Sequence, residues 1–596
     1  MIATSRRLAL LALAVSLALG CTAEYYRNSA DEEVYGIIKE KQAEAGFEET
    51  DFDIDPKVDT LRNRLLANLD TLQAEAGIEG VLPIELTSTA ASFEDEGAPS
   101  GGPTLEVSQD SDLVAPDADL APDDQDLPDV LVLNLDSCLA TAAENSRDFQ
   151  REKENVYLAA LNLTFERFLF QNRYFGGATA SAGQDLPEER SGTVSPSGGF
   201  TRRLANGASI IFDIGAILFD TFVGKRDESA RSFINLAITQ PLLRGAGKKI
   251  VQEPLTLAER NALYAIRDFE RFKKLLAVNV ATEMYRVVQQ LDRVNNNKAN
   301  YDRLVRSRER IEALAEAGRT PQFQVDQARQ DELSARNSWI STVRNYETSL
   351  DRFKLTLGLP TDADIVIDRT VLVDLVEAGI RPVDFDLDGA QSFALENRLD
   401  LLNDRDFVAD SRRAVMVAEN ALLTQLDVSF DMNIDNERNK PFRMKFGDGD
   451  YIVGLDLDLP LDRKRERNAY RSAIIGLERQ IRAYTLAEDN VKLDIRNAIR
   501  NLAQAEESYR IQEIALQLAE RRVESTELLQ QAGRANTRDV LESQEALLAT
   551  QNGITAALID HTIARMELVR DMGLLIVDQE GLSYDASTDR YTQAGT

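Results

Sequence analysis

Few side chains in this 596-residue sequence are arranged for catalysis or for binding a metal ion. The chain holds one histidine, His561, and two cysteines, so it lacks the Cys/His clusters that bind zinc. Gly245-x-Gly247-Lys248-Lys249 is too short for a phosphate-binding loop and is more typical of a turn between a strand and a helix. Carboxylates are abundant, and no pair stands out as an acid and a base. We therefore expect no enzyme, no cofactor and no metal site, and we expect His561 to be a packing or surface residue.

Two carboxylates, Asp539 and Glu542, follow the stretch Ala532-Gly533-Arg534, and their spacing places them on one face of a helix. A copy of this stretch, Ala317-Gly318-Arg319, lies 215 residues earlier. At the positions of the two carboxylates the first copy carries amides, Gln324 and Gln327. The same spacing continues without a gap to two further glycines, Gly358 and Gly573. Because an internal repeat determines the whole architecture, we expect a duplicated fold.

Long helical patterns precede each glycine turn. Residues 247–318 contain proline only at Pro254, and residues 463–533 contain none, so each pattern predicts a helix of roughly 100 Å. Apolar residues in both recur at spacings of three and four, which is typical of laterally packed helices. We therefore expect each repeat to consist of a helix, strands, a long helix, a turn and a second long helix.

Strict alternation of apolar and polar residues predicts strands ahead of the long helices, at 208–219, 233–239, 425–435 and 451–459. Motif spacing shows that the first repeat holds 33 extra residues, which we place in 176–207 because that stretch contains Gly176-Gly177, Pro196 and the turn Asn206-Gly207. Alternation also fits a soluble sheet with one face in water. Strands of about ten residues, however, match the 9–11 that cross a bilayer obliquely.

The N-terminus has the pattern of a secretory signal. Arg6-Arg7 are followed by an apolar stretch, Leu8 to Leu19, which is too short to span a membrane. Ala18-Leu19-Gly20-Cys21 resembles a bacterial lipobox, in which Cys21 would become the lipidated first residue and carry palmitate. The alternative is an ordinary signal peptide with an incidental cysteine. With Cys21 acylated, Cys138 has no partner for a disulfide and is expected to be a small core residue.

Composition and repeats together divide the chain into six segments. The segment before the repeats is acidic, and part of it is too rich in Asp, Pro, Gly and Ser to fold. The formal charge of −32 argues against nucleic acid as a partner, because phosphates require Lys and Arg. The expected segments are a signal peptide (1–20), an acidic periplasmic extension (21–90), a disordered linker (91–129), a first repeat (130–360), a second repeat (361–580) and a polar tail (581–596).

The duplicated order of these motifs, over about 131–577, resembles the TolC-like outer-membrane efflux proteins. The resemblance rests on both glycine turns and on two further motifs, Leu236-x-Ile238-x-Gln240-Pro241-Leu242-Leu243-Arg244-Gly245-x-Gly247 and Leu455-x-Leu457-x-Leu459-Pro460-Leu461-Asp462. It implies a mainly α fold with a membrane β-barrel. In this fold three protomers each lend four strands to a 12-stranded barrel and long helices to a periplasmic α-barrel.

The resemblance also implies a function, that of an exit duct which passively conducts substrates across the periplasm and outer membrane in a tripartite efflux or type I secretion system. The implied partners are two other copies, a periplasmic adaptor, an inner-membrane pump and outer-membrane lipid. The alternative is a non-conducting periplasmic coiled-coil scaffold or adaptor lipoprotein.

The site residues follow from the same resemblance. Asp539, Glu542, Gln324 and Gln327 would line the pore constriction, where a ring of carboxylates holds cations. Asp539 alternatively serves only as a helix N-terminal residue favoured by the helix dipole. The turns that would contact the adaptor are at Gly318, Arg319, Gly533 and Arg534. The residues expected in the barrel lumen are Asp427, Asp431, Asp456 and Asp458.

Overall fold

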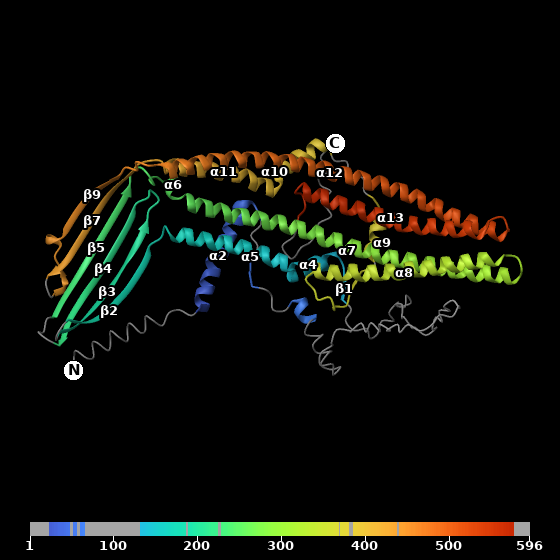
Figure 1. Ribbon diagram of the computed structural model, residues 1–596, viewed down its shortest axis with the longest axis horizontal. Helices are drawn as coiled ribbons and strands as arrows, with labels where there is room; N and C mark the ends of the chain where they lie inside the picture. The colour runs from blue at the N-terminus through green and yellow to red at the C-terminus, as the bar shows by residue number, and fades with distance from the viewer. Residues whose placement is uncertain are drawn as a thin grey trace, which may run out of the picture.

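The computed structural model describes residues 23–47, 52–55, 60–65, 131–185, 189–223, 228–368, 370–380, 386–437 and 440–576. The expected signal peptide, Cys21, the linker 91–129 and the tail 581–596 lie outside these residues. The described chain is elongated, with one sheet at one end and long helices running away from it (Figure 1).

The two repeats have the predicted order of elements. In the first repeat, helix α5 leads to four strands, a short helix α6 and two long helices. In the second, α11 leads to three strands and again to two long helices. At 64 and 68 residues, α7 and α12 are each roughly 100 Å long, as predicted. The bounds are α5 (Arg147–Phe168), α6 (Lys248–Val251), α7 (Glu253–Glu316), α8 (Gln322–Thr356), α11 (Leu399–Asn420), α12 (Lys464–Gln531) and α13 (Thr537–Asp571).

The sheet is antiparallel and contains seven strands, in the order β2-β3-β4-β5-β7, with both β8 and β9 paired to β7. The short strand β8 pairs only at the end of β7, at Asn436 and Glu437. The other six strands are 9 to 15 residues long and lie side by side (Figure 1). Their bounds are β2 (Arg173–Asp185), β3 (Glu189–Arg203), β4 (Ser209–Val223), β5 (Glu228–Pro241), β7 (Gln425–Glu437), β8 (Lys440–Met444) and β9 (Asp450–Asp458).

The strand count corrects one expectation. All four alternating segments are strands, and the turn at Asn206-Gly207 joins β3 to β4, with Gly207 at φ +99°. The 33 extra residues form most of an additional hairpin, β2–β3. The described residues therefore form six long strands of this sheet, where the resemblance implied four from each protomer.

The two faces of the sheet differ in polarity. Residues that lie opposite each other on neighbouring strands share a face, so the register shows which side chains each face carries. Apolar residues form rows across neighbouring strands, as where Ile238 lies opposite Phe430 and Phe430 opposite Val453. The opposite face is mostly polar, although Ile211 and Ile452 also lie on it. This polar face carries all four of the aspartates expected in a lumen: Asp427, Asp431, Asp456 and Asp458.

The helices share a central core where the two repeats meet. Cys138 is fully buried there, with residues of α7, α8 and α13, and the pKa of its thiol is raised by burial to about 12, so Cys138 is the predicted core residue. The core also holds a parallel pair of short strands, in which Leu131 lies opposite Ile365. The remaining elements here are β1 (Leu131–Leu133), α4 (Leu135–Asn145), β6 (Ile365–Ile367), α9 (Thr370–Ala378) and α10 (Leu387–Asn397).

The two repeats use the same junction. Gly358, at φ +78°, follows α8 and packs so closely on the carbonyl of Asn145 that an added Cβ would lie 2.1 Å from that oxygen. Gly573, at φ +82°, follows α13 and faces the carbonyl of Asn397 less closely, because an added Cβ there would lie 3.4 Å from that oxygen, at ordinary contact distance. Asn145 and Asn397 are the last residues of α4 and α10.

Part of the N-terminal extension is helical. Helix α2 (Ala23–Ala45) buries Val34, Ile37 and Ile38 against α5 and α7. Further along, the Arg62 guanidinium donates to the Gly358 carbonyl at 2.7 Å. Among the described residues, no helix is both long enough and apolar enough to cross a bilayer.

Candidate gate at the helical tip

Both predicted glycine turns lie at the end of the molecule farthest from the sheet (Figure 1). Gly318 and Gly533 adopt left-handed φ values of +69° and +70°, which an L-residue rarely adopts. The amides of Arg319 and Arg534 then donate back to the carbonyls of Leu314 and Leu529, which closes both helices. Both arginine side chains are exposed, so they are available to a partner at the tip.

Asp539 is part of a helix cap. Its carboxylate accepts a hydrogen bond from the Asn536 amide at 3.0 Å, and the Asn536 side chain accepts one from the Asp539 amide at 3.0 Å. This reciprocal capping box stabilises the first turn of α13. Glu542, one turn further along, pairs with Arg522 of α12 at 2.7 Å. Both carboxylates therefore have partners within the protomer, and the helix-terminal role considered for Asp539 is present in the structure.

The amides of the first tip lie next to the second tip. The Thr537 hydroxyl donates to the side-chain amide oxygen (Oε1) of Gln324 at 3.1 Å and so links α13 to the start of α8. Gln327 and Glu542 line one polar groove between the two helical hairpins, together with Asp331. Burial, and then repulsion from Glu545, raise the pKa of the Asp331 carboxyl. The structure thus brings the four predicted constriction residues to one end of the molecule.

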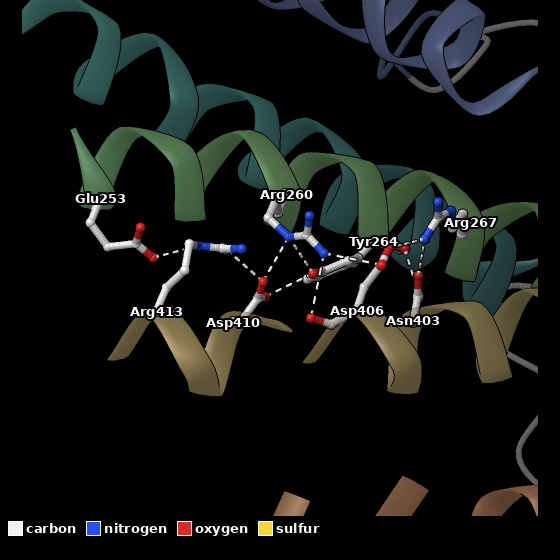
Figure 2. A network of polar contacts seen from close by, with 8 residues as sticks. All are labelled: Glu253, Arg260, Tyr264, Arg267, Asn403, Asp406, Asp410 and Arg413. Atoms are coloured by element: carbon white, nitrogen blue, oxygen red, sulfur yellow. Dashed lines mark hydrogen bonds and ion pairs between the residues drawn. The ribbon is translucent and has the colours of Figure 1, made fainter. Parts of the chain in front are cut away.

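A polar network near the sheet, which sequence patterns did not indicate, joins the repeats through α7 and α11 (Figure 2). The Asp410 carboxylate accepts from Arg260 at 2.7 Å, from Arg413 at 2.5 Å and from the Tyr264 hydroxyl at 2.7 Å. Burial raises the pKa of Tyr264, so its hydroxyl remains a donor. The network continues to either side through further ion pairs and hydrogen bonds of Glu253, Arg267, Asn403 and Asp406.

The single histidine, His561, lies inside the helical part of the molecule. His561 is only 3% exposed, within the helical core, and burial lowers the pKa of its imidazole. It is therefore a packing residue, one of the two roles expected for it. The described residues contain no group of three or more His, Cys, Asp or Glu side chains placed to hold a metal ion.

Comparisons with known proteins agree with this geometry. Residues 391–574 match the family model of the outer membrane efflux protein. No curated protein matches the sequence. Among solved structures, the CmeC outer membrane channel of Campylobacter jejuni is 14% identical, at a TM-score of 0.55 over 76% of this chain and 88% of that chain.

Two further outer membrane proteins are similar to the same extent. The outer membrane protein VceC of Vibrio cholerae is 13% identical, at a TM-score of 0.55 over 74% of this chain and 96% of that chain. The open MtrE outer membrane channel of Neisseria gonorrhoeae is 12% identical, at a TM-score of 0.53 over 76% of this chain and 95% of that chain. The chain thus shares the fold of these outer membrane proteins over about three quarters of its length, and residues 391–574, in its second repeat, match the outer membrane efflux protein family.

Proposed function

We propose that this protein is the outer-membrane exit duct of a tripartite efflux or type I secretion system. The observation that carries the proposal is a one-sided apolar sheet joined directly to helices of roughly 100 Å. On the apolar face, Val453 is 76% exposed and Leu455 is 69% exposed in the single protomer. An exposed apolar face of this size marks a surface that contacts lipid or protein.

The open edges of the sheet require closure with other copies, and the resemblance to the TolC-like proteins supplies the number of three. Backbone groups at an open strand edge cannot be satisfied in lipid, so a sheet in the membrane must close with other copies of itself. Closure places the face with Asp427 and Asp456, which lie directly opposite each other, toward a wet lumen. The helices then extend into the periplasm, where the exposed Arg319 and Arg534 turns would meet a periplasmic adaptor bound to an inner-membrane pump.

The test is the conductance of the purified protein in planar bilayers. We expect a trimer that shifts on heating in gels and inserts as a pore. A trimer that conducts nothing would refute the duct and favour the coiled-coil scaffold, which has no barrel to unfold on heating. Anchoring through Cys21 is tested separately, because Cys21→Ser should abolish labelling with radioactive palmitate.

Substitutions at the tip test the proposed gate. We expect Asp539→Ala combined with Glu542→Ala to raise conductance, because it removes the carboxylate half of the capping box and the ion pair of α13 with Arg522. The matched control is Asp489→Ala, an exposed acid, 68% accessible, on α12 and away from the tip. Equal conductance of the two variants, with intact trimers, would remove the gating role.

A further inference from the structure

The β2–β3 hairpin belongs fully to the sheet. All thirteen residues of β2 pair with β3, from Arg173 opposite Thr201 to Asp185 opposite Glu189. β3 in turn pairs with β4 along most of its length, from Val194 opposite Leu218 to Arg203 opposite Ser209. The hairpin is therefore neither a loop over the sheet nor a plug, but two additional strands in its plane.

The hairpin also continues the two faces of the sheet. On the apolar face, Tyr174 lies opposite Phe200, and Phe200 lies opposite Phe212. Small and apolar residues extend this face along both strands: Gly176, Ala178, Ala180, Ala182, Gly192, Val194, Pro196 and Gly198. Since no charged residue interrupts it between 174–182 and 192–200, this face is compatible with lipid.

Between 177–183 and 191–201 the other face of the hairpin is polar or small and uncharged, and charged residues lie only at its two ends. It presents hydroxyl side chains in opposed pairs, such as Thr179 with Ser195 and Ser181 with Thr193. The register places them on the side of the sheet that carries Asp213, Asp431 and Asp456. Hydroxyl groups on this side are solvated by a wet lumen, so both faces of the hairpin suit the wall of a membrane pore.

The outer strands of the long-stranded sheet are β2 and β9, and they run in opposite directions, because each of the six strands is antiparallel to its neighbour. Strand β9 of one copy can thus pair with β2 of the next in an antiparallel ladder, as closed membrane barrels require. Every copy added in this way contributes six strands.

We propose that the β2–β3 hairpin enlarges the outer-membrane pore, so that three copies close a barrel of 18 strands, six from each. The proposal rests on the proposed function, which supplies the trimer. At a strand spacing of about 4.8 Å and a tilt of about 40°, 18 strands give a circumference of roughly 113 Å, against roughly 75 Å for 12 strands.

The circumference of the wider barrel is close to that of the ring of helices beneath it. Each chain sends four helices to the sheet, α5, α7, α11 and α12. Twelve helices packed at about 10 Å give a circumference of roughly 120 Å. The 18-stranded barrel continues this circumference almost unchanged, so the exit sets no tighter size limit than the helical duct.

Imaging the full-length protein in lipid nanodiscs by electron cryomicroscopy tests the strand count. We expect 18 strands, with β9 of each copy beside β2 of the next. A 12-stranded barrel with the hairpin outside the wall or inside the lumen would overturn the proposal. A protein without any trimeric barrel would instead refute the proposed function, and heat-shift gels of the unsubstituted protein distinguish that result.

Cysteine cross-linking gives a second, matched test. Asp456→Cys on β9 is combined with single cysteines scanned along the polar side of β2, at 179, 181 and 183, or along the same side of β4, at 213, 215 and 217. We expect covalent oligomers only from the β2 series. Cross-links from β4, or none from β2 in an intact trimer, would contradict the 18-stranded closure.

Deleting residues 173–203 removes both strands and leaves residues 169–172 and 204–208 to connect α5 to β4. We expect a trimer with a 12-stranded barrel about two thirds as wide, since barrel diameter grows roughly linearly with strand number. Polyethylene glycols added from the outer side of a planar bilayer should then be excluded from the pore at correspondingly smaller sizes. An unchanged exclusion size in a folded trimer would overturn the proposal, and a variant that fails to fold leaves the cross-linking series to decide it.

Discussion

The prediction most directly tied to the packing of the two repeats concerns Asp410. Its carboxylate is 13% exposed and holds three donors, Arg260, Arg413 and Tyr264, between α7 and α11 (Figure 2). We expect Asp410→Asn to destabilise the folded chain. The change keeps the size of the side chain but removes the charge that compensates two partly buried guanidinium groups.

The size of the effect follows from the exposure of the partners. Removing one partner from a fully buried ion pair costs about 3–5 kcal/mol. The side chains of Arg260 and Arg413 are 25% and 22% exposed, and each retains a second carboxylate, Asp406 or Glu253. Solvent and these remaining partners reduce the expected loss to roughly 1.5–2.5 kcal/mol.

The matched control is Asp435→Asn, which breaks an ion pair of similar length, 2.7 Å to Arg231, but with both side chains more than half exposed. Exposed pairs contribute about 0–1 kcal/mol. Guanidinium unfolding is followed by the fluorescence of Trp339, the single tryptophan, which stacks on Tyr301. If Asp410→Asn costs no more than Asp435→Asn, the network does not stabilise the contact between the repeats.

Two further predictions concern the tip and the repeat junction. Asp331→Asn should stabilise the protein at pH 7, because burial and Glu545 raise the pKa of the Asp331 carboxyl. Because the pKa of Asp331 is raised in the folded state, the folded state binds the proton at a higher pH than the unfolded state does. The free energy of unfolding of the wild-type protein should therefore rise as pH falls through that pKa, and the Asn variant should lack this rise. Parallel plots of unfolding free energy against pH for the two proteins would contradict the reasoning. Gly358→Ala should cost more than the ~1–2 kcal/mol of left-handed strain alone, because its Cβ would lie 2.1 Å from the Asn145 carbonyl. Gly318→Ala, with no atom within 4 Å of its Cβ, should cost only the strain, and equal melting temperatures for the two variants would show that the junction relaxes freely.

Much of the architecture could be predicted because its signals are local and repeated. Glycines at matching places in both copies marked the turns, and the long stretches without proline after Pro254 and after Arg463 marked α7 and α12. Alternation located β4, β5, β7 and β9, since a two-faced sheet imposes a period of two.

The β2 and β3 strands did not show this period. Both consist mainly of Gly, Ala, Ser and Thr, as in Gly176-Gly177-Ala178 and Ser195-Pro196-Ser197, so their apolar face has too little contrast with their polar face to be recognised. Only the extra length of the first repeat indicated that something was inserted. The number of strands could therefore not be predicted, because it is established by the hydrogen bonds between strands, and a single sequence does not show which segments pair.

The candidate gate was predictable in position but not in contacts. The repeat identified Asp539, Glu542, Gln324 and Gln327 as equivalent positions at two tips. The hydrogen bond of Gln324 to Thr537 and the ion pair of Glu542 with Arg522 depend on how the two hairpins pack. The same holds for the α7–α11 network, whose partners are separated by up to 160 residues in the sequence.

The parallel pairing of β1 with β6 determines when the central core can fold during synthesis of the chain. Leu131 to Leu133 must pair with Ile365 to Ile367, which leave the ribosome only after the whole first repeat. Until then the first strand has no partner, and the core around Leu133 also lacks the α13 residues Ile559, Ile563 and Met566. The centre of the molecule is thus completed last, by segments from both ends of the chain. A protein released before α13 is made would leave this core open, so the arrangement favours complete chains over truncated ones.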